Sequence, residues 1–375
     1  MIYLDNAASS FPKPKSVIKV ISKSLKDNTA NPGRSGHFLS EQAAHRVYLQ
    51  RAKAAQFFGC AEENVIFTLN ATHSINTALK GVLHSGDHVV ISDLEHNSVL
   101  RPLVWLRDNI GISFDVVKTD LYDDEKTVKA FDAMIKPQTK LVFCTHASNV
   151  TGKILPVDKI GLLCKEKGCF FFTDASQTAG FILPNNYDIL CTSGHKGLYG
   201  PQGTGLMIIK NTNVLPITSI LQGGTGSNSL DYNQPDILPE SLESGTLNTP
   251  GILGLGAGID FVNKNQKKII TREKLLLTEG IRLLSKLPDI TIYSNNENNT
   301  PLFSFNVSNT NSDTVTEYLN INKICVRGGY HCAALAHEKL GTIKIGAVRV
   351  SIGAFNKMEE IEKFIYTLKK YIKIK

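Results

Sequence analysis

Seven short apolar runs recur between residues 65 and 209, and helix-length stretches separate them. The runs are rich in β-branched and aromatic residues, and polar or glycine residues bound them. They are Val65–Thr68, His88–Ser92, Phe114–Val117, Leu141–Thr145, Phe170–Thr173, Ile189–Thr192 and Gly205–Ile209. This pattern is typical of buried strands that alternate with helices. We expect an α/β fold with a mostly parallel seven-stranded sheet that carries helices on both faces.

Beyond about residue 260 the pattern changes to shorter, mixed elements. The predicted elements are a basic helix over Lys264–Lys286, strands at Thr291–Tyr293 and Leu302–Val307, a helix at Thr314–Leu319, a strand at Val348–Ile352 and a terminal helix at Met358–Tyr371. We interpret this part as a smaller α+β domain. Residues 1–13 are too short to fold alone, so we assign residues 14–260 to the large domain and residues 1–13 and 261–375 to the small one.

Polar residues that directly follow the predicted strands are the first functional candidates, because ligands of such sheets bind at the carboxyl ends of the strands. Asn70–Ser74 is a turn of small residues before a predicted helix. Free backbone N–H groups and the positive end of a helix dipole make such a turn a seat for phosphate. A plain helix cap formed by Thr72 explains it equally well.

Asp174 and Lys196 follow two successive strands and should therefore lie near each other. Burial would lower the pKa of Lys196 and make its amine a nucleophile, whereas an ordinary surface lysine is the alternative. Asp174 is either a helix cap or a carboxylate that points into the crevice. An acid that pairs with a protonated ring nitrogen, an amine that binds an aldehyde and a phosphate seat together predict pyridoxal 5′-phosphate as the cofactor.

Nucleotide cofactors are disfavoured by the glycine pattern. The sequence has no GxxxxGK[ST] motif, and the glycine run Gly251–Gly258 lacks both a preceding strand and the GxGxxG spacing. An ordinary nucleotide-binding α/β protein is thus the weaker alternative.

Composition excludes several other classes. No stretch approaches the roughly 20 apolar residues of a membrane-spanning helix, and the opening residues lack the order of a signal peptide. The seven cysteines form no CxxC pair, which indicates a reducing, cytoplasmic environment and no metal site. The net charge of +7 is scattered except at Lys369, Lys370, Lys373 and Lys375. We interpret these lysines as a solvated tail, so neither a nucleic acid nor a membrane is expected as a partner.

Motifs over nearly the whole chain resemble the cysteine desulfurase branch of the class V aminotransferase family. They are Tyr3–Ser9, Asn31–His37 with Arg34, Ser193–Lys196 followed by Tyr199–Gly203, Glu243–Thr249, Val326–Cys332 and Arg349–Ser351. The resemblance implies the fold type I of pyridoxal phosphate-dependent transferases and conversion of L-cysteine to L-alanine with a persulfide left on the enzyme.

The resemblance also implies roles for the cofactor-binding residues. Lys196 holds the cofactor covalently and shuttles protons, Asp174 pairs with the ring nitrogen, Gln177 binds the ring O3′, and His96 stacks on the ring and is part of the catalytic set. The phosphate is implied to be held by Thr72, the backbone of His73, Ser193, His195 and, from a neighbouring subunit, Thr246. A homodimer would then complete both sites.

For the substrate, the resemblance implies that Asn149 and Arg349 grip the carboxylate and that Cys332 is the nucleophile. Arg327 belongs to the same site, and Arg327 and His331 are close enough in sequence to favour the thiolate form of Cys332. A buried, inert thiol is the alternative for Cys332, but an Arg-Gly-Gly-Tyr-His context is not a core pattern.

Only seventeen positions separate Cys332 from Arg349, which resembles the short cysteine loop of group II members. That group includes selenocysteine lyases and desulfurases that need a sulfur-accepting protein, as in iron–sulfur cluster biogenesis. The chain departs from the group by His73 and by the Ala-Ala-Leu-Ala-His sequence after Cys332. Selenocysteine lyase, another class V aminotransferase or lyase, and a non-catalytic scaffold therefore stay open as alternatives.

Overall fold

A computed structural model describes residues 1–27, 30–33, 36–214, 216–226, 229–294 and 297–374 of the 375-residue chain. Arg34 of the second motif and Lys375 of the basic tail lie outside the described residues.

The predicted sheet forms the centre of the molecule, in the strand order β2-β8-β7-β6-β5-β3-β4. Its strands are β2 (Val65–Thr68), β3 (His88–Ser92), β4 (Ser113–Val117), β5 (Thr139–Thr145), β6 (Phe170–Asp174), β7 (Ile189–Ser193) and β8 (Gly205–Ile209). All neighbours pair in parallel except β8, which is antiparallel to both β2 and β7. The prediction of a mostly parallel seven-stranded sheet is confirmed.

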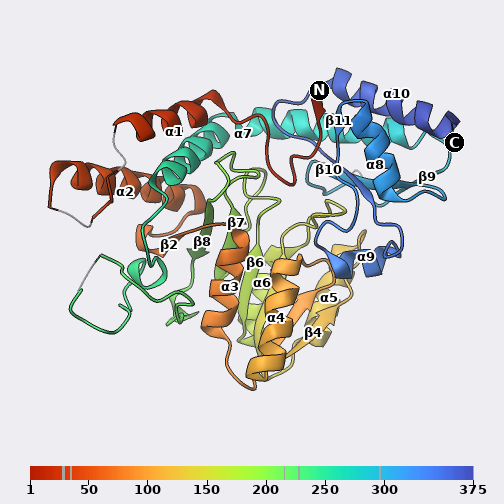
Figure 1. Ribbon diagram of the computed structural model, residues 1–375. Coiled ribbons are helices and arrows are strands. Elements are labelled where there is room, and N and C mark those ends of the chain that lie inside the picture. Colours follow the sequence, from red (N-terminus) through yellow and green to blue (C-terminus); the bar gives the residue numbers. More distant parts are fainter. Residues whose placement is uncertain (28–29, 34–35, 215, 227–228, 295–296, 375) are drawn as a thin grey trace.

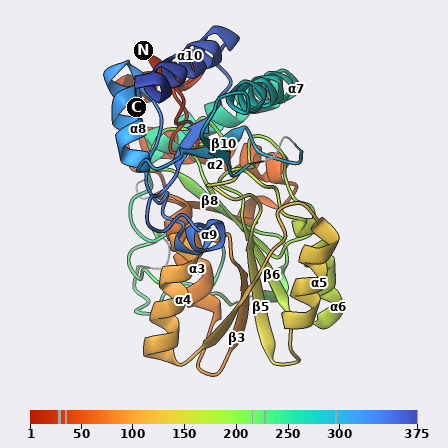
Figure 2. The ribbon, with the colours of Figure 1, turned by 90° about the vertical axis from the view of Figure 1, so that its right-hand side faces the viewer.

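Helices cover both faces of this sheet (Figure 2). One face carries α3 (Ala71–Val82) and α4 (Asn97–Ile110), and the other carries α5 (Asp124–Met134) and α6 (Val157–Lys167). Each face has its own apolar core, with Ile75 and Leu103 in one and Phe131 and Ile160 in the other. The strands are buried on both sides, which explains why they read as continuous apolar runs.

The C-terminal part builds a second layer above the sheet (Figure 1). β10 (Leu302–Val307) pairs antiparallel with β9 (Ile290–Ile292) and β12 (Val348–Ser351), and α8 (Ser312–Ile321) and α10 (Met358–Ile374) pack there. β1 (Ile2–Tyr3) pairs in parallel with β11 (Ile324–Cys325), so the N-terminal strand joins this part of the fold. The remaining elements are α1 (Lys15–Asp27), α2 (Phe38–Phe58), α9 (Ala334–Leu340) and the short 3₁₀ helices Glu62–Asn64, Thr212–Val214 and Glu240–Leu242.

One long helix, α7 (Thr249–Leu284), runs through the boundary predicted at residue 260. Its first half places Ile252 and Ile259 in the core of the sheet, whereas its second half places Leu277 and Leu284 in the core around β10. The helix therefore joins two apolar cores, and the division of the chain into two domains stays a prediction. No described helix is long and apolar enough to cross a membrane.

Candidate active site

A cavity of about 270 Å³ lies at the carboxyl ends of the central strands. Many of the predicted cofactor and substrate residues form its wall, namely Thr72, His96, Asn149, Asp174, Gln177, Ser193, His195 and Lys196. They come from turns far apart in the sequence, which the parallel sheet brings to one edge.

Lys196 follows β7 in the turn Ser193-Gly-His-Lys. Burial, together with the charges of Arg349 and Arg327, lowers the pKa of its amine to about 8, although the Asp174 carboxylate opposes this shift. A substantial neutral fraction at neutral pH is what an amine nucleophile requires.

Asp174 ends β6, and its carboxylate accepts a hydrogen bond from the backbone N–H of Ser176 at 2.8 Å. His96 precedes α4, and its Nδ1 accepts from the backbone N–H of Ser98 at 3.0 Å. Burial, with the charge of Lys196, lowers the pKa of His96 to about 4, so the ring is neutral at pH 7. A neutral, oriented imidazole in this wall suits stacking on a flat aromatic ring.

At the phosphate-binding turn predicted before α3, one backbone N–H group is already hydrogen-bonded within the protein. Asn70 caps the helix, and its side chain accepts from the His73 amide at 2.9 Å. His73 also accepts from the Leu69 amide through its ring, at 3.2 Å. Because the cap engages its amide, the predicted backbone role of His73 in phosphate binding stays a prediction.

Two buried polar atoms in the cavity wall have no partner among the described residues: Nδ1 of His195 and Oγ of Ser176. Buried polar groups are almost always hydrogen-bonded in native proteins. Together with the helix start and the amine of Lys196, these atoms fit a ligand that carries an anionic group and an aldehyde, as pyridoxal 5′-phosphate does.

Thr246 is exposed and does not line this cavity. It borders a separate hollow of about 80 Å³ together with His73. Its predicted role across a subunit boundary stays a prediction.

Arg349 on β12 is fully buried next to the cavity. Its Nη1 donates to the Asn149 carbonyl and its Nη2 to the Asp5 carboxylate, both at 2.9 Å, while Nε has no partner among the described residues. Asp5 lies inside the opening motif Tyr3–Ser9, but no feature of the sequence marks it as a partner of Arg349. Asn149 donates its side-chain amide to the His331 carbonyl at 2.7 Å, so it lies between Arg349 and the cysteine loop.

Cys332 is the exposed cysteine of the described chain, whereas the other six are buried or half-buried. Its carbonyl accepts from the Asn97 amide at 2.7 Å, which brings the loop against the turn of His96. The Arg327 guanidinium lies 3.9 Å from the Cys332 sulfur and can donate a weak hydrogen bond to it.

The suggestion that His331 also favours the thiolate is wrong. Burial and the charge of Arg349 hold the pKa of His331 well below its usual range, so the ring carries no positive charge at neutral pH. Its Nε2 lies 3.2 Å from the Arg327 carbonyl oxygen.

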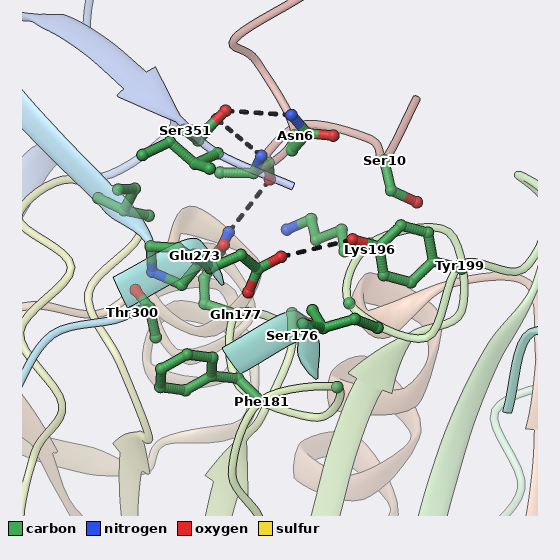
Figure 3. Close-up of a pocket in the computed structure, with 17 residues that line it drawn as sticks. Asn6, Ser10, Ser176, Gln177, Phe181, Lys196, Tyr199, Glu273, Thr300 and Ser351 are labelled. Atoms are coloured by element: carbon green, nitrogen blue, oxygen red, sulfur yellow. Dashed lines mark hydrogen bonds between the residues drawn. The ribbon is translucent and has the colours of Figure 1, made fainter. Parts of the chain in front are cut away.

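A second, smaller cavity of about 50 Å³ shares Lys196, Ser176 and Gln177 with the first (Figure 3). Glu273 from α7 points into it, and the Tyr199 hydroxyl donates to that carboxyl at 3.5 Å. Burial raises the pKa of Glu273 to about 8. No motif marks Glu273, because an acid on a mostly basic helical stretch looks like surface in the sequence.

Gln177, predicted to bind the ring O3′, donates its side-chain amide to the Ala7 carbonyl at 3.2 Å. It lines both cavities, and its predicted contact stays a prediction. No cluster of three or more metal-binding side chains occurs within the described ranges.

Comparison with known proteins agrees with this geometry. A sequence model of the family "Aminotransferase class-V" matches residues 2–364. A probable cysteine desulfurase of Methanothermobacter thermautotrophicus is 32% identical over 382 residues, which cover 98% of this chain and 94% of that protein. The chain belongs to the class V aminotransferase family.

Solved structures of similar proteins show the same fold. The apo cysteine desulfurase of Thermococcus onnurineus NA1 matches with a TM-score of 0.93 and 32% identity, covering 100% of this chain and 95% of the other. A cysteine desulfurase from Escherichia coli matches with a TM-score of 0.88 at 23% identity, and at that identity the likeness concerns the fold alone. Enzymes of this class V family depend on pyridoxal 5′-phosphate, and the chain shares that cofactor.

Proposed function

We propose that the protein is a cysteine desulfurase, which converts L-cysteine to L-alanine and carries the sulfur as a persulfide on Cys332. The observation that carries this proposal is the position of Cys332. It is an exposed thiol beside a guanidinium, and its backbone is bonded to the turn of His96, which lines the cavity that contains Lys196. The names of the similar proteins support the same activity.

The chain's residues divide the work. Lys196 holds the cofactor and takes up the proton from the substrate Cα, which its pKa of about 8 permits. With the cofactor bound, Asp174 would keep the ring nitrogen protonated, His96 would cover the ring face, and Arg349 with Asn149 would orient the substrate carboxylate. When bound, pyridoxal 5′-phosphate supplies the electron sink for the pair left on Cα.

Sulfur transfer then balances without an external oxidant. The Cys332 thiolate forms an S–S bond to the substrate sulfur as the substrate Cβ–S bond breaks, and the freed carbon takes up a proton. The net change moves one sulfur atom from L-cysteine to Cys332 and leaves L-alanine. Arg327 lies where it can stabilise the attacking thiolate.

The experiment measures L-alanine and sulfide release from L-cysteine by the wild type and by Cys332→Ala, with a reductant present. We expect both products from the wild type and a loss of at least about 100-fold in the variant, since no other exposed thiol is described. Wild type that carries the cofactor but is inert toward L-cysteine would contradict the proposal. Cleavage of L-selenocysteine by Cys332→Ala would favour a selenocysteine lyase, because selenium leaves without thiolate attack.

Partners and location extend the proposal. A sulfur-acceptor protein is needed to remove the persulfide, a homodimer would let Thr246 of one subunit reach the other, and the free cysteines are suited to the cytoplasm. Supply of sulfur for iron–sulfur cluster assembly is the process in which such an enzyme would act.

A further inference from the structure

The short helix α9, which begins two residues after Cys332, packs into the core of the seven-stranded sheet, although β11 before it and β12 after it contribute to the core around β10. Ala333 and Ala336 are fully buried in the core that contains β5 and β6. Leu335 packs against the core on the other face of the sheet. The part of the sequence after Cys332 that departs from the group II pattern is therefore the segment that docks here.

A half-buried ion pair fixes the far end of α9. The Lys339 ammonium donates to the Asp93 carboxylate at 2.7 Å and also to the Thr119 carbonyl. Asp93 in turn accepts from the hydroxyl of Thr119 at 2.6 Å and from its backbone amide at 3.2 Å. Each partner is thus held by more than one bond, which distinguishes the pair from a mobile surface contact.

The loop that carries Asp93 also carries His96, and Asn97, the first residue of α4, donates its amide to the Cys332 carbonyl at 2.7 Å. Two contacts therefore join the same pair of segments, one at each end of α9.

The backbone at Cys332 requires such support. His331 and Cys332 both have positive φ, 52° and 56°, a conformation that costs a non-glycine residue energy and persists only when its surroundings hold it. Behind them the His331 and His337 rings stack, with Nδ1 of the first 3.3 Å from Nε2 of the second. His337 also contacts the Thr342 hydroxyl at 2.7 Å, so α9 holds the loop from this side too.

We infer that Lys339 and Asp93 are a positioning pair for sulfur transfer, which holds Cys332 in register with the His96 turn through α9. The inference rests on the proposed desulfurase activity. The segment after Cys332 would then have a function of its own, which is to hold the thiol in a fixed position. A misplacement of about 1 Å can cost on the order of 100-fold in rate, so a modest change in α9 should be visible.

The test uses Lys339→Met, which keeps the length of the side chain but removes its charge. In the apo-protein, hydrogen exchange of the peptide that contains the Asn97 amide should be about ten-fold or more faster than in wild type. In the holoenzyme, single-turnover persulfide formation should fall by about ten-fold or more, while the apparent KM for L-cysteine stays within about two-fold. Lys339→Arg should restore most of the rate.

Lys136→Met is the matched control, because Lys136 bonds Asp115 at 2.6 Å on the edge strand β4, remote from Cys332. Asp93→Asn and the double variant Lys339→Met/Asp93→Asn complete a double-mutant cycle. The effect of the double variant on the exchange and persulfide rates should be smaller than the sum of the two single effects. Exchange and persulfide rates equal to wild type in both single variants would overturn the inference. So would an Lys339→Met effect that Lys136→Met reproduces, since it would reflect stability alone.

The outcome also separates this inference from the proposed function. A wild type that is inert toward L-cysteine would refute the desulfurase proposal even if the exchange at Asn97 responds to Lys339→Met. A wild type that is active and a Lys339→Met variant that forms persulfide at the same rate would refute the positioning role alone.

Discussion

Among the residues of the site, Lys196 owes its reactivity to its surroundings. Burial of its ammonium, together with the charges of Arg349 and Arg327, lowers its pKa to about 8, although Asp174 opposes the shift. An exposed lysine, with an ordinary value of 10.5, would be almost entirely protonated at pH 7.

Covalent attachment of the cofactor should therefore follow the titration of Lys196. Below pH 8 the neutral fraction of the amine rises about ten-fold per pH unit, so the attachment rate should rise by that factor and level off just above pH 8. Mixing apo-protein with pyridoxal 5′-phosphate at a series of pH values, and trapping the adduct with borohydride, measures the rate. A rate that keeps rising to about pH 10.5 would show an unperturbed lysine, and Lys196→Ala should trap no adduct.

Arg349 tests the binding of the substrate carboxylate. Arg349→Ala removes charge-assisted hydrogen bonds that are each worth about 1.5 to 3 kcal/mol, so the apparent KM for L-cysteine should rise about 10- to 100-fold. The turnover at saturating substrate should change less, and steady-state kinetics separate the two constants. A loss confined to the turnover number would count against a role in carboxylate binding.

At this scale the predictable residues were those that follow a strand directly. Asp174, His96, Asn149 and Lys196 all line the cavity that the strand ends predict. His331 was misjudged, because adjacency to Cys332 in sequence says nothing about which way a ring turns or how deeply it is buried. Glu273 could not be predicted as a site residue, because its burial depends on packing between segments that are distant in the sequence.

Among the elements, α7 links the two apolar cores. It also places Glu273 in the wall of the smaller cavity, which Lys196 lines as well. Burial raises the pKa of this carboxyl from 4.5 to about 8. An acid whose pKa is higher in the folded state favours folding fully only below its unfolded pKa, and that contribution is lost as pH rises through the folded value.

Wild-type stability should accordingly fall between about pH 4.5 and pH 8 through Glu273, by an amount on the order of 3 to 5 kcal/mol at most. Glu273→Gln keeps the shape and cannot ionise, so its stability should depend less on pH in this window. Urea unfolding of both apo-proteins at pH 5 and pH 8 measures the difference. Glu359→Gln, at an exposed position on α10, is the control and should match wild type. Parallel pH dependence of Glu273→Gln and wild type would contradict a buried neutral acid.

The sequence predicts the long, buried elements well and the short ones poorly. Strands β2 to β8 were found from the sequence within one or two residues, because burial on both faces makes each a continuous apolar run. The pairing of β1 with β11 and the docking of α9 were not, since such short segments carry no periodic signal. Their structure comes from partners hundreds of residues away or on another layer.

For the whole molecule, the cysteine loop connects two layers. Arg327 pairs through its backbone with Arg349 on β12, whereas Cys332 contacts the turn of His96 in the sheet layer. The site is thereby assembled from both parts of the chain. Thr246 remains outside it in one subunit.

Subunit mixing tests the proposed homodimer. Lys196→Ala and Thr246→Asp should each be inactive alone, the latter through repulsion of the cofactor phosphate. In a mixed dimer one site would hold a native Lys196 and a native Thr246 from opposite subunits, so mixing should restore about a quarter of the activity per enzyme. Sedimentation gives the oligomeric state. A monomer, or no recovery after verified subunit exchange, would contradict a shared site.

The most direct test of the central claim is to find the transferred sulfur. Holoenzyme is mixed with one equivalent of L-cysteine, quenched with an alkylating reagent and digested. The mass of the peptide that contains Cys332 is then measured by mass spectrometry. We expect this peptide to gain one sulfur atom for each L-alanine that appears, and no other cysteine peptide to gain sulfur. Alanine formed without sulfur on Cys332, or sulfur on another cysteine, would contradict it.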